Sequence, residues 1–260
     1  NKCMLKKVKK ILLKKNKTPL VCLTSYSKAF SRIIDKYCDI ILVGDSLAHV
    51  LYGMKSTKNM TLEMMIKHTQ SVKLGVKKSL LIVDMPKNSY KNKKVALKNA
   101  RQILQKTGCD GVKLESNLKN YNIINHLTKA GITVMGHIGY TPQFKQKFKV
   151  SGNTSNEKNK LIKDAMNIEK AGAFSIVLEC IKASVAKEIT KKLKISTIGI
   201  GSSVSCDGQI LVTDDLLGLS GFYPKFLKKF ANLNKVIEKG IQKYKNDVQK
   251  RKFPQRKNSY

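Results

Sequence analysis

Acidic, basic and hydroxyl side chains follow a series of short apolar runs in this sequence. The clearest run, 40–43, is rich in branched residues, ends at Gly44 and is followed by Asp45 and Ser46. Such a run predicts a strand buried on both faces, as in a parallel sheet. A carboxylate and a hydroxyl just beyond it stand where barrel and doubly wound enzymes carry out their chemistry. Taken alone, the same residues also fit a turn that caps the next segment.

The pattern repeats along the chain, which favours a site over a turn. The polar residues at the ends of the predicted strands are, in chain order, Ser25, Asp45, Ser46, Asp84, Lys113, Glu115, His137, Glu179 and Ser202. In a closed parallel barrel the C-terminal ends of all strands meet on one face, whatever their separation in sequence. Clustered buried acids repel one another unless protons or a cation relieve them. We therefore expect these acids to form one site that holds a cation.

The types of donor atom predict which cation this is. No Cys and no pair of His accompanies the acids, and an all-oxygen set suits a hard cation such as Mg²⁺. We expect two or three of Asp45, Asp84 and Glu115 to hold Mg²⁺. The remaining carboxylate, Glu179, is then available for proton transfer. Two interpretations of His137 stay open, namely a contact with the substrate or a ligand, and a satisfied core histidine.

The elements that must position these residues alternate along the chain. Eight apolar runs predict strands at 19–23, 40–43, 80–83, 111–114, 132–135, 174–178, 195–200 and 209–212. Stretches of helical period lie between them, among them 62–76, which Thr61 can cap, and 95–107. Eight β–α units fit a closed (β/α)₈ barrel better than an open sheet. We predict an α/β chain that is a single TIM-barrel domain over 1–260, with a basic N-terminal helix and a basic C-terminal tail.

The formal net charge of +34 is unusually high for an enzyme and suggests a nucleic-acid partner. However, only four of the 51 Lys and Arg residues are Arg, the residue on which specific nucleic-acid sites depend. The lysines are spread over the whole length, which favours solvated faces over a dedicated binding surface. We therefore expect no specific nucleic-acid partner.

The sequence also bears on the compartment of the protein. No apolar run approaches the roughly 18 residues of a membrane span, and the basic N-terminus lacks the uninterrupted apolar stretch of a signal peptide. The six cysteines show no C-x-x-C pair and no metal-ligand spacing. We expect reduced thiols, a cytoplasmic location and no membrane partner.

Seven segments together resemble one enzyme family. They are VGDSL at 43–47, STKNMTLEMMIKHTQSV at 56–72, DMPKNSY at 84–90, VKLE at 112–115, VMGHIGYTPQ at 134–143, AGAFSIVLEC at 171–180, and TIGIG followed by CDGQILVTDDLLG at 197–218. This ordered set, which runs through most of the chain, resembles the ketopantoate hydroxymethyltransferase family.

The resemblance implies a fold, a reaction and an assembly. Members of the family are (β/α)₈ barrels of the phosphoenolpyruvate/pyruvate type, usually assembled as decamers. They transfer a one-carbon unit from 5,10-methylenetetrahydrofolate to 3-methyl-2-oxobutanoate, giving 2-dehydropantoate in pantothenate and coenzyme A synthesis. The resemblance therefore implies a homo-oligomer whose partners are a small 2-oxo acid and a folate.

The motifs also carry over roles residue by residue. Asp45, Asp84 and Glu115 match the ligands of one Mg²⁺ per subunit, and Glu179 matches the proton acceptor. The residues that match the 2-oxo acid contacts, together with two further strand-end residues that we expect to join them, are Asp45, Ser46, Asp84, Lys113, His137 and Ser202. These assignments agree with the interpretation of the strand ends.

Two alternatives belong to other classes of protein. One is a related Mg²⁺-dependent barrel that acts on a different 2-oxo acid, such as a lyase. The intact CDGQ and GHIGYTPQ segments argue against it. The other is a basic nucleic-acid-binding protein without catalysis, against which the acids retained at the strand ends argue.

Overall fold

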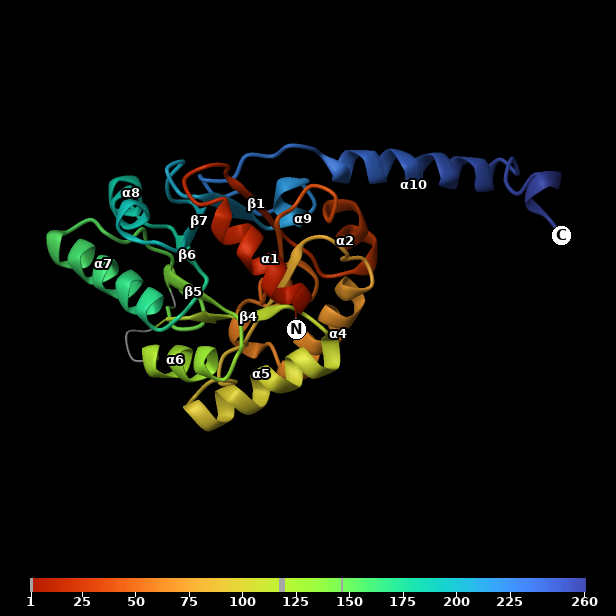
Figure 1. The fold of residues 1–260 in the computed structure, drawn as a ribbon. Helices are drawn as coiled ribbons and strands as arrows, with labels where there is room; N and C mark the ends of the chain where they lie inside the picture. Colours follow the sequence, from red (N-terminus) through yellow and green to blue (C-terminus); the bar gives the residue numbers. More distant parts are fainter. Residues whose placement is uncertain (1, 117–119, 146) are drawn as a thin grey trace. The chain divides into compact units, whose positions relative to one another are not determined.

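A computed structural model describes residues 2–116, 120–145 and 147–260 of the chain. It divides into two compact units, Asn1–Val212 and Thr213–Tyr260. Eight parallel strands of the first unit close into a barrel, each paired with the next and β8 paired with β1 (Figure 1). The strands are β1 (Leu20–Thr24), β2 (Ile40–Val43), β3 (Leu80–Asp84), β4 (Gly111–Glu115), β5 (Val134–Gly139), β6 (Ser175–Glu179), β7 (Ser196–Ile200) and β8 (Gly208–Leu211). The predicted closed (β/α)₈ barrel is confirmed.

Helices precede, connect and surround these strands (Figure 1). Those of the first unit are α1 (Lys2–Leu13), α2 (Lys28–Ile34), α3 (Leu47–Val50), the 3₁₀ turn Thr57–Asn59, α4 (Leu62–Lys73), α5 (Lys93–Thr107), α6 (Tyr121–Lys129), α7 (Ser155–Lys170) and α8 (Ala183–Lys192). Those of the second unit are α9 (Thr213–Leu216), α10 (Leu233–Gln249) and the 3₁₀ turn Arg256–Asn258. Among the residues that the structure describes, no helix is long and apolar enough to cross a membrane.

Local signals explain where several helices begin and end. The side chain of Thr61 accepts a hydrogen bond from the backbone N–H of Met64, so its predicted capping of α4 is confirmed. Asn92 and Thr154 cap α5 and α7 in the same way. Helix α5 ends at Gly108, which adopts a left-handed conformation with a φ of 65° that favours glycine.

Alternation along each strand divides the apolar side chains between two cores. On β2, Ile40 and Leu42 belong to the core inside the barrel, whereas Ile41 and Val43 belong to the core between the strands and the surrounding helices. A strand buried on both faces needs a continuous apolar run, which is the pattern that identified β2 in the sequence.

The fifth strand differs from its prediction. Instead of 132–135 it spans Val134–Gly139, so Gly136 and His137 lie inside the strand and not beyond its end. A side chain at Gly136 would bring its Cβ to 2.5 Å from Cγ2 of Ile168 on α7. The glycine therefore permits close packing of a helix on the strand and does not break it.

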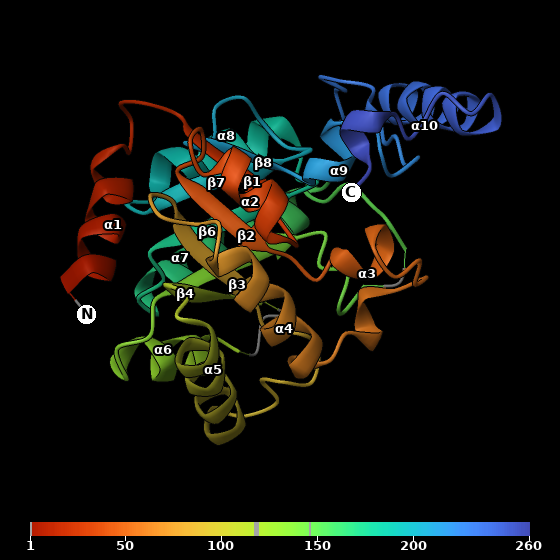
Figure 2. The same ribbon diagram turned by 90° about the vertical axis from the view of Figure 1, so that its right-hand side faces the viewer.

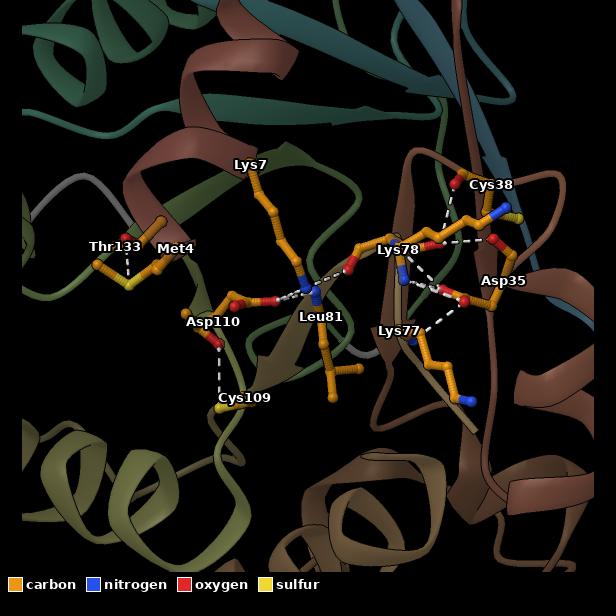
Figure 3. Close-up of polar contacts among 12 residues, drawn as sticks. Met4, Lys7, Asp35, Cys38, Lys77, Lys78, Leu81, Cys109, Asp110 and Thr133 are labelled. Carbon is orange, nitrogen blue, oxygen red and sulfur yellow. Dashed lines mark hydrogen bonds and ion pairs between the residues drawn. The ribbon is translucent and has the colours of Figure 1, made fainter. Parts of the chain in front are cut away.

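Helix α1 covers the end of the barrel at which the strands begin (Figure 2). Ile11 of this helix is 2% exposed and packs into the inner core. Lys7 Nζ donates hydrogen bonds to the carbonyl of Ser79 at 2.9 Å and to Asp110 Oδ2 at 3.1 Å (Figure 3). We call this end of the barrel, at which the strands begin, the floor.

Three aspartates directly precede β2, β4 and β8, and we call them the floor aspartates. Each of them pairs with a lysine of α1 or of the turn after α1. The pairs are Asp39 with Lys14 at 2.6 Å, Asp110 with Lys7 at 3.1 Å, and Asp207 with Lys15 at 2.6 Å. Each floor aspartate also accepts a backbone N–H from the neighbouring strand, donated by Val21, Leu81 and Thr197 respectively. The floor therefore ties adjacent strands together through matched charges.

Candidate active site

The alternation that fills the barrel also positions the predicted site residues. Lys113 and Glu115 are two residues apart on β4, so they share its inward face. Lys113 is the register partner of Asp84 on β3, and Glu115 is the register partner of His137 on β5. The residues of this polar layer, which we call the mouth cluster, are Asp45, Asp84, Lys113, Glu115, His137 and Glu179. All but Glu179 are at most 5% exposed.

Asp84 links two members of the cluster. Its Oδ1 lies 2.9 Å from Lys113 Nζ, and its Oδ2 accepts the backbone N–H of Asp45 at 2.9 Å. Burial acts to lower the pKa of Lys113, but the carboxylates of Asp84, Glu115 and Asp45 outweigh burial and raise that pKa above its ordinary value. Lys113 is therefore a permanent positive charge in the site.

Gln143, on the segment after β5, contacts two of the acids. Its Nε2 donates to Asp45 Oδ2 at 2.8 Å and to the carbonyl of Met85 at 3.0 Å. Its backbone N–H donates to Glu115 Oε2 at 3.0 Å. The hydroxyl of Tyr90 donates to Gln143 Oε1. One neutral residue thus orients carboxylates from two different strands.

His137 lies between Lys113 and Glu179. Lys113 Nζ lies 3.2 Å from His137 Nδ1, and because an ammonium only donates, Nδ1 must be the acceptor. Burial, followed by the charge of Lys113, lowers the pKa of His137 well below its ordinary value, so the ring is neutral and carries its hydrogen on Nε2. Nε2 lies 3.1 Å from Glu179 Oε2, although its N–H is not aligned for a hydrogen bond. Such contacts often tighten only when substrate is bound.

Three acids of the mouth cluster lie in surroundings that disfavour their ionised form. Burial, and next the charge of Asp84, raise the pKa of Asp45 to about 7. Burial also raises the pKa of Glu179 to about 7, against the opposing charge of Lys113. The pKa of Glu115 is raised well above its ordinary value by burial and then by Asp45. The cluster thus contains more carboxylates than Lys113 can neutralise.

This surplus of oxygen ligands fits a hard divalent cation. Mg²⁺ characteristically binds one or two carboxylates and completes its octahedron with water and substrate oxygens. Asp45 and Asp84, joined through the N–H of Asp45, are the pair best placed to provide them. Within the described residues, no three His, Cys, Asp or Glu side chains form a ready-made metal cage, so Glu115 as a third direct ligand stays a prediction.

The two serines predicted to bind substrate differ in their surroundings. Ser46 Oγ lies 2.8 Å from the hydroxyl of Tyr26, directly after Asp45. Ser202 Oγ instead donates to the carbonyl of Leu178 at 2.7 Å and accepts the N–H of Ile181 at 3.1 Å. The Ser202 hydroxyl is thus hydrogen-bonded to two backbone groups. Ser202 therefore has a structural role between β6 and β7.

Inspection of the sequence missed Gln143, Tyr90 and Tyr26. Gln143 and Tyr90 lie in segments that carry the family resemblance, GHIGYTPQ and DMPKNSY, but an amide and a phenol have no chemistry of their own that singles them out. The partners of Gln143 are distant in sequence: Asp45 is 98 positions away, Met85 is 58 and Tyr90 is 53. Only the folded chain brings these residues together.

Fold and site together define a barrel enzyme with a buried carboxylate cluster at the C-terminal ends of its strands. Among solved structures, the chain resembles phosphoenolpyruvate phosphomutase from Streptomyces platensis subsp. rosaceus, with a TM-score of 0.64 and 9% identity over 95% of this chain and 87% of that one. It also resembles 2,3-dimethylmalate lyase, a PEP mutase/isocitrate lyase superfamily member, with a TM-score of 0.60 and 10% identity over 94% and 88%. These likenesses confirm the predicted (β/α)₈ barrel fold.

Sequence comparison is more specific. The model of the ketopantoate hydroxymethyltransferase family matches residues 5–256. The chain is 52% identical to the 3-methyl-2-oxobutanoate hydroxymethyltransferase of Pelagibacter ubique (strain HTCC1062), covering 99% of this chain and 100% of that one. It is 47% identical to the enzyme of the same name from Rhizobium etli, over 91% and 88%. The chain therefore belongs to the ketopantoate hydroxymethyltransferase family, and the predicted hydroxymethyltransferase is confirmed.

Proposed function

We propose that the mouth cluster transfers a hydroxymethyl group from 5,10-methylenetetrahydrofolate to 3-methyl-2-oxobutanoate, giving 2-dehydropantoate for pantothenate synthesis. The names of the relatives support the acceptor and the group transferred. One observation about the site carries the proposal. The carboxyl of Glu179 has a pKa raised to about 7. His137 lies between this carboxyl and the permanently charged Lys113, which also pairs with Asp84. That arrangement separates a proton acceptor from a charge-binding group.

The chemistry demands both groups. The reacting hydrogen is on C3 of the substrate, next to the ketone, and is too weakly acidic for a carboxylate base acting alone. Mg²⁺, one per subunit and held by Asp45 and Asp84 with Glu115 as the third predicted ligand, would supply a Lewis acid for the negative charge that develops on the keto oxygen. The positive charge of Lys113 attracts the substrate carboxylate or the enolate oxygen.

Glu179 accepts the C3 proton, and the electron pair left on C3 forms the new bond to the methylene carbon of the folate. The two carbon–nitrogen bonds of that methylene break with their electron pairs kept by the nitrogens, water supplies the hydroxyl oxygen of the product, and tetrahydrofolate is released. His137, whose Nε2 lies 3.1 Å from Oε2, orients Glu179 when this contact aligns on substrate binding. Ser46, next to Asp45, is an additional contact for the 2-oxo acid. We leave Ser202 out of the substrate contacts, because its hydroxyl already has two backbone partners.

An assay for 2-dehydropantoate tests this function. Purified protein should form 2-dehydropantoate only when both substrates are present, and EDTA should abolish the activity until Mg²⁺ is restored. Product formed at the same rate in EDTA would contradict the metal, and no product under any condition would contradict the reaction.

We also propose that the enzyme is a cytoplasmic homo-oligomer, with a decamer as the expected assembly. The cysteines Cys22, Cys38, Cys109, Cys180 and Cys206 are buried free thiols, which suits a reducing compartment. Size-exclusion chromatography with light scattering should give a mass near ten times the 29.2 kDa chain. A monomeric mass would contradict the assembly.

We also propose that the protein has no specific nucleic-acid partner despite its high positive charge. Binding to random duplex DNA should be weak, indifferent to sequence and steeply reduced by salt, because it depends on counterion release alone. Tight, sequence-selective binding at physiological salt would contradict this.

A further inference from the structure

We propose that Gln143, supported by Tyr90, is a positioning residue that sets the orientation of Asp45 and Glu115 for the cation and the substrate. The inference rests on the proposed function of the same site. It assigns a role to two residues that do not themselves carry out any chemistry, and it explains why a neutral amide lies at the centre of a group of acids.

The contacts of Gln143 connect three neighbouring strand ends. Nε2 donates at 2.8 Å to Asp45, which follows β2, and at 3.0 Å to the carbonyl of Met85, which follows β3. The backbone N–H donates at 3.0 Å to Glu115, which ends β4. Gln143 is 1% exposed, so water does not compete for these contacts.

The surroundings of the amide fix which way it faces. Both groups next to Nε2 are acceptors, so the opposite orientation would set Oε1 against a carboxylate and a carbonyl. The hydroxyl of Tyr90, itself 5% exposed, satisfies Oε1 from the other side. Every polar atom of the side chain thus has a partner, which is the condition for a rigid buried polar network.

A neutral donor suits this position for an electrostatic reason. Its hydrogen bond engages Oδ2 of Asp45, which leaves Oδ1 to face a cation or the substrate. A Lys or Arg would orient the acids equally well, but its charge would compete with the cation for them. A Glu would add another carboxylate to a cluster whose acids already exceed its ammonium groups. The side-chain amide therefore orients Asp45 without changing the charge of the site, while the backbone N–H of the same residue holds Glu115.

The test measures metal binding directly, with Mn²⁺ alone as the probe, by electron paramagnetic resonance of the free ion. Gln143→Met keeps length and volume but removes the side-chain donor, and it should weaken Mn²⁺ binding by about 10- to 100-fold, as typically follows loss of a residue that orients a metal ligand. Tyr90→Phe removes only the hydroxyl behind the amide and should give a smaller loss.

Tyr121→Phe is the matched control. It also removes a tyrosine hydroxyl that donates to a carboxylate, but that carboxylate belongs to Asp164 on α7, which is not a member of the mouth cluster. Its Mn²⁺ affinity should equal that of the parent. A merely structural role of Gln143 and Tyr90 would lower the melting temperature of the variants without changing the Mn²⁺ affinity of the folded protein. If Gln143→Met does not fold, the difference between Tyr90→Phe and Tyr121→Phe decides.

The outcomes separate this inference from the proposed function. Parental Mn²⁺ affinity in folded Gln143→Met or, failing that, in Tyr90→Phe would overturn the inference even if the parent forms 2-dehydropantoate. Weakened binding in both variants supports it even if the parent forms no 2-dehydropantoate, a result that would contradict only the proposed reaction. A parent that binds no Mn²⁺ would overturn the inference as well.

Discussion

The two ends of the barrel use carboxylates in opposite ways. At the floor, each aspartate has a lysine of its own and a backbone N–H from the next strand. Asp35, nearby, has no lysine partner but accepts the N–H groups of Lys77, Lys78 and Ser79 (Figure 3). Partial burial acts to raise the pKa of Asp35, and these N–H groups outweigh it and lower that pKa. The surroundings of Asp35 therefore favour its ionised form.

At the mouth, the balance is reversed. Among the described residues, Lys113 is the only ammonium in contact with the mouth cluster, and it pairs with Asp84. The pKa values of Asp45 and Glu179 are both raised to about 7, first of all by burial. Carboxylates therefore stabilise the fold at one end, and at the other end we propose that they bind a cation and accept a proton. Substitution of Glu179 at the mouth and substitution of a floor aspartate should consequently change the stability of the fold in opposite directions.

The largest expected effect is on turnover, from loss of an acid at the mouth. Asp84→Asn should lower Mg²⁺-dependent formation of 2-dehydropantoate to the limit of detection, because it removes a predicted metal ligand and the ion-pair partner of Lys113. The protein should remain folded by circular dichroism. Unchanged turnover in this variant would remove Asp84 from the metal site.

Glu179→Gln is expected to have the next largest effect. It keeps shape and hydrogen-bonding capacity but cannot accept the proton, so turnover should fall by about 10²–10⁴-fold. Binding of 3-methyl-2-oxobutanoate, measured calorimetrically, should change little. Turnover within a few-fold of the parent would make His137 the next candidate base.

The same variant tests how burial affects stability. The folded-state pKa of Glu179, about 7, lies above the ordinary value of 4.5, so folding favours the protonated form. The stabilisation that protonated Glu179 gives to the fold is fully present below pH 4.5 and is lost as the pH rises to about 7. Glu179→Gln should therefore unfold at a higher urea concentration than the parent at pH 8. Asp207→Asn at the floor should do the reverse.

The pH profile of the parent should report the same group. Glu179 must be ionised to accept a proton, so kcat/KM should fall about tenfold per pH unit below pH 7 and level off above it. A profile that is flat between pH 5 and 8 would show that no group with this pKa limits the reaction.

The smallest expected effect on activity comes from the floor. Asp207→Asn leaves Lys15 buried without its partner, since the side chains of the pair are only 5% and 10% exposed. The loss should be about 3 kcal/mol in the free energy of unfolding, measured with urea. Activity at 25 °C should equal that of the parent. Loss of turnover in folded protein would show that the two ends are coupled.

How far the sequence predicts this molecule differs between the two ends. The acids of the mouth end or follow apolar runs, so the convergence of parallel strand ends already placed Asp45, Asp84, Glu115 and Glu179 on one face of the barrel. The conformation of the segment after β5 has no such period, and it alone brings Gln143 to Asp45. The chain contains so many lysines that the sequence does not indicate which three pair with the floor aspartates. That pairing depends on where α1 packs.

The assignment of the mouth cluster as the active site is tested most directly by exchange of the C3 hydrogen of 3-methyl-2-oxobutanoate in D₂O. The exchange is followed by proton NMR in the absence of folate. This isolates the proton transfer assigned to Glu179 from the later bond formation. The parent with Mg²⁺ should exchange this hydrogen, and EDTA or Glu179→Gln should stop the exchange. Exchange that is equally fast in the parent, in EDTA and in Glu179→Gln would contradict the assignment of the mouth cluster as the active site.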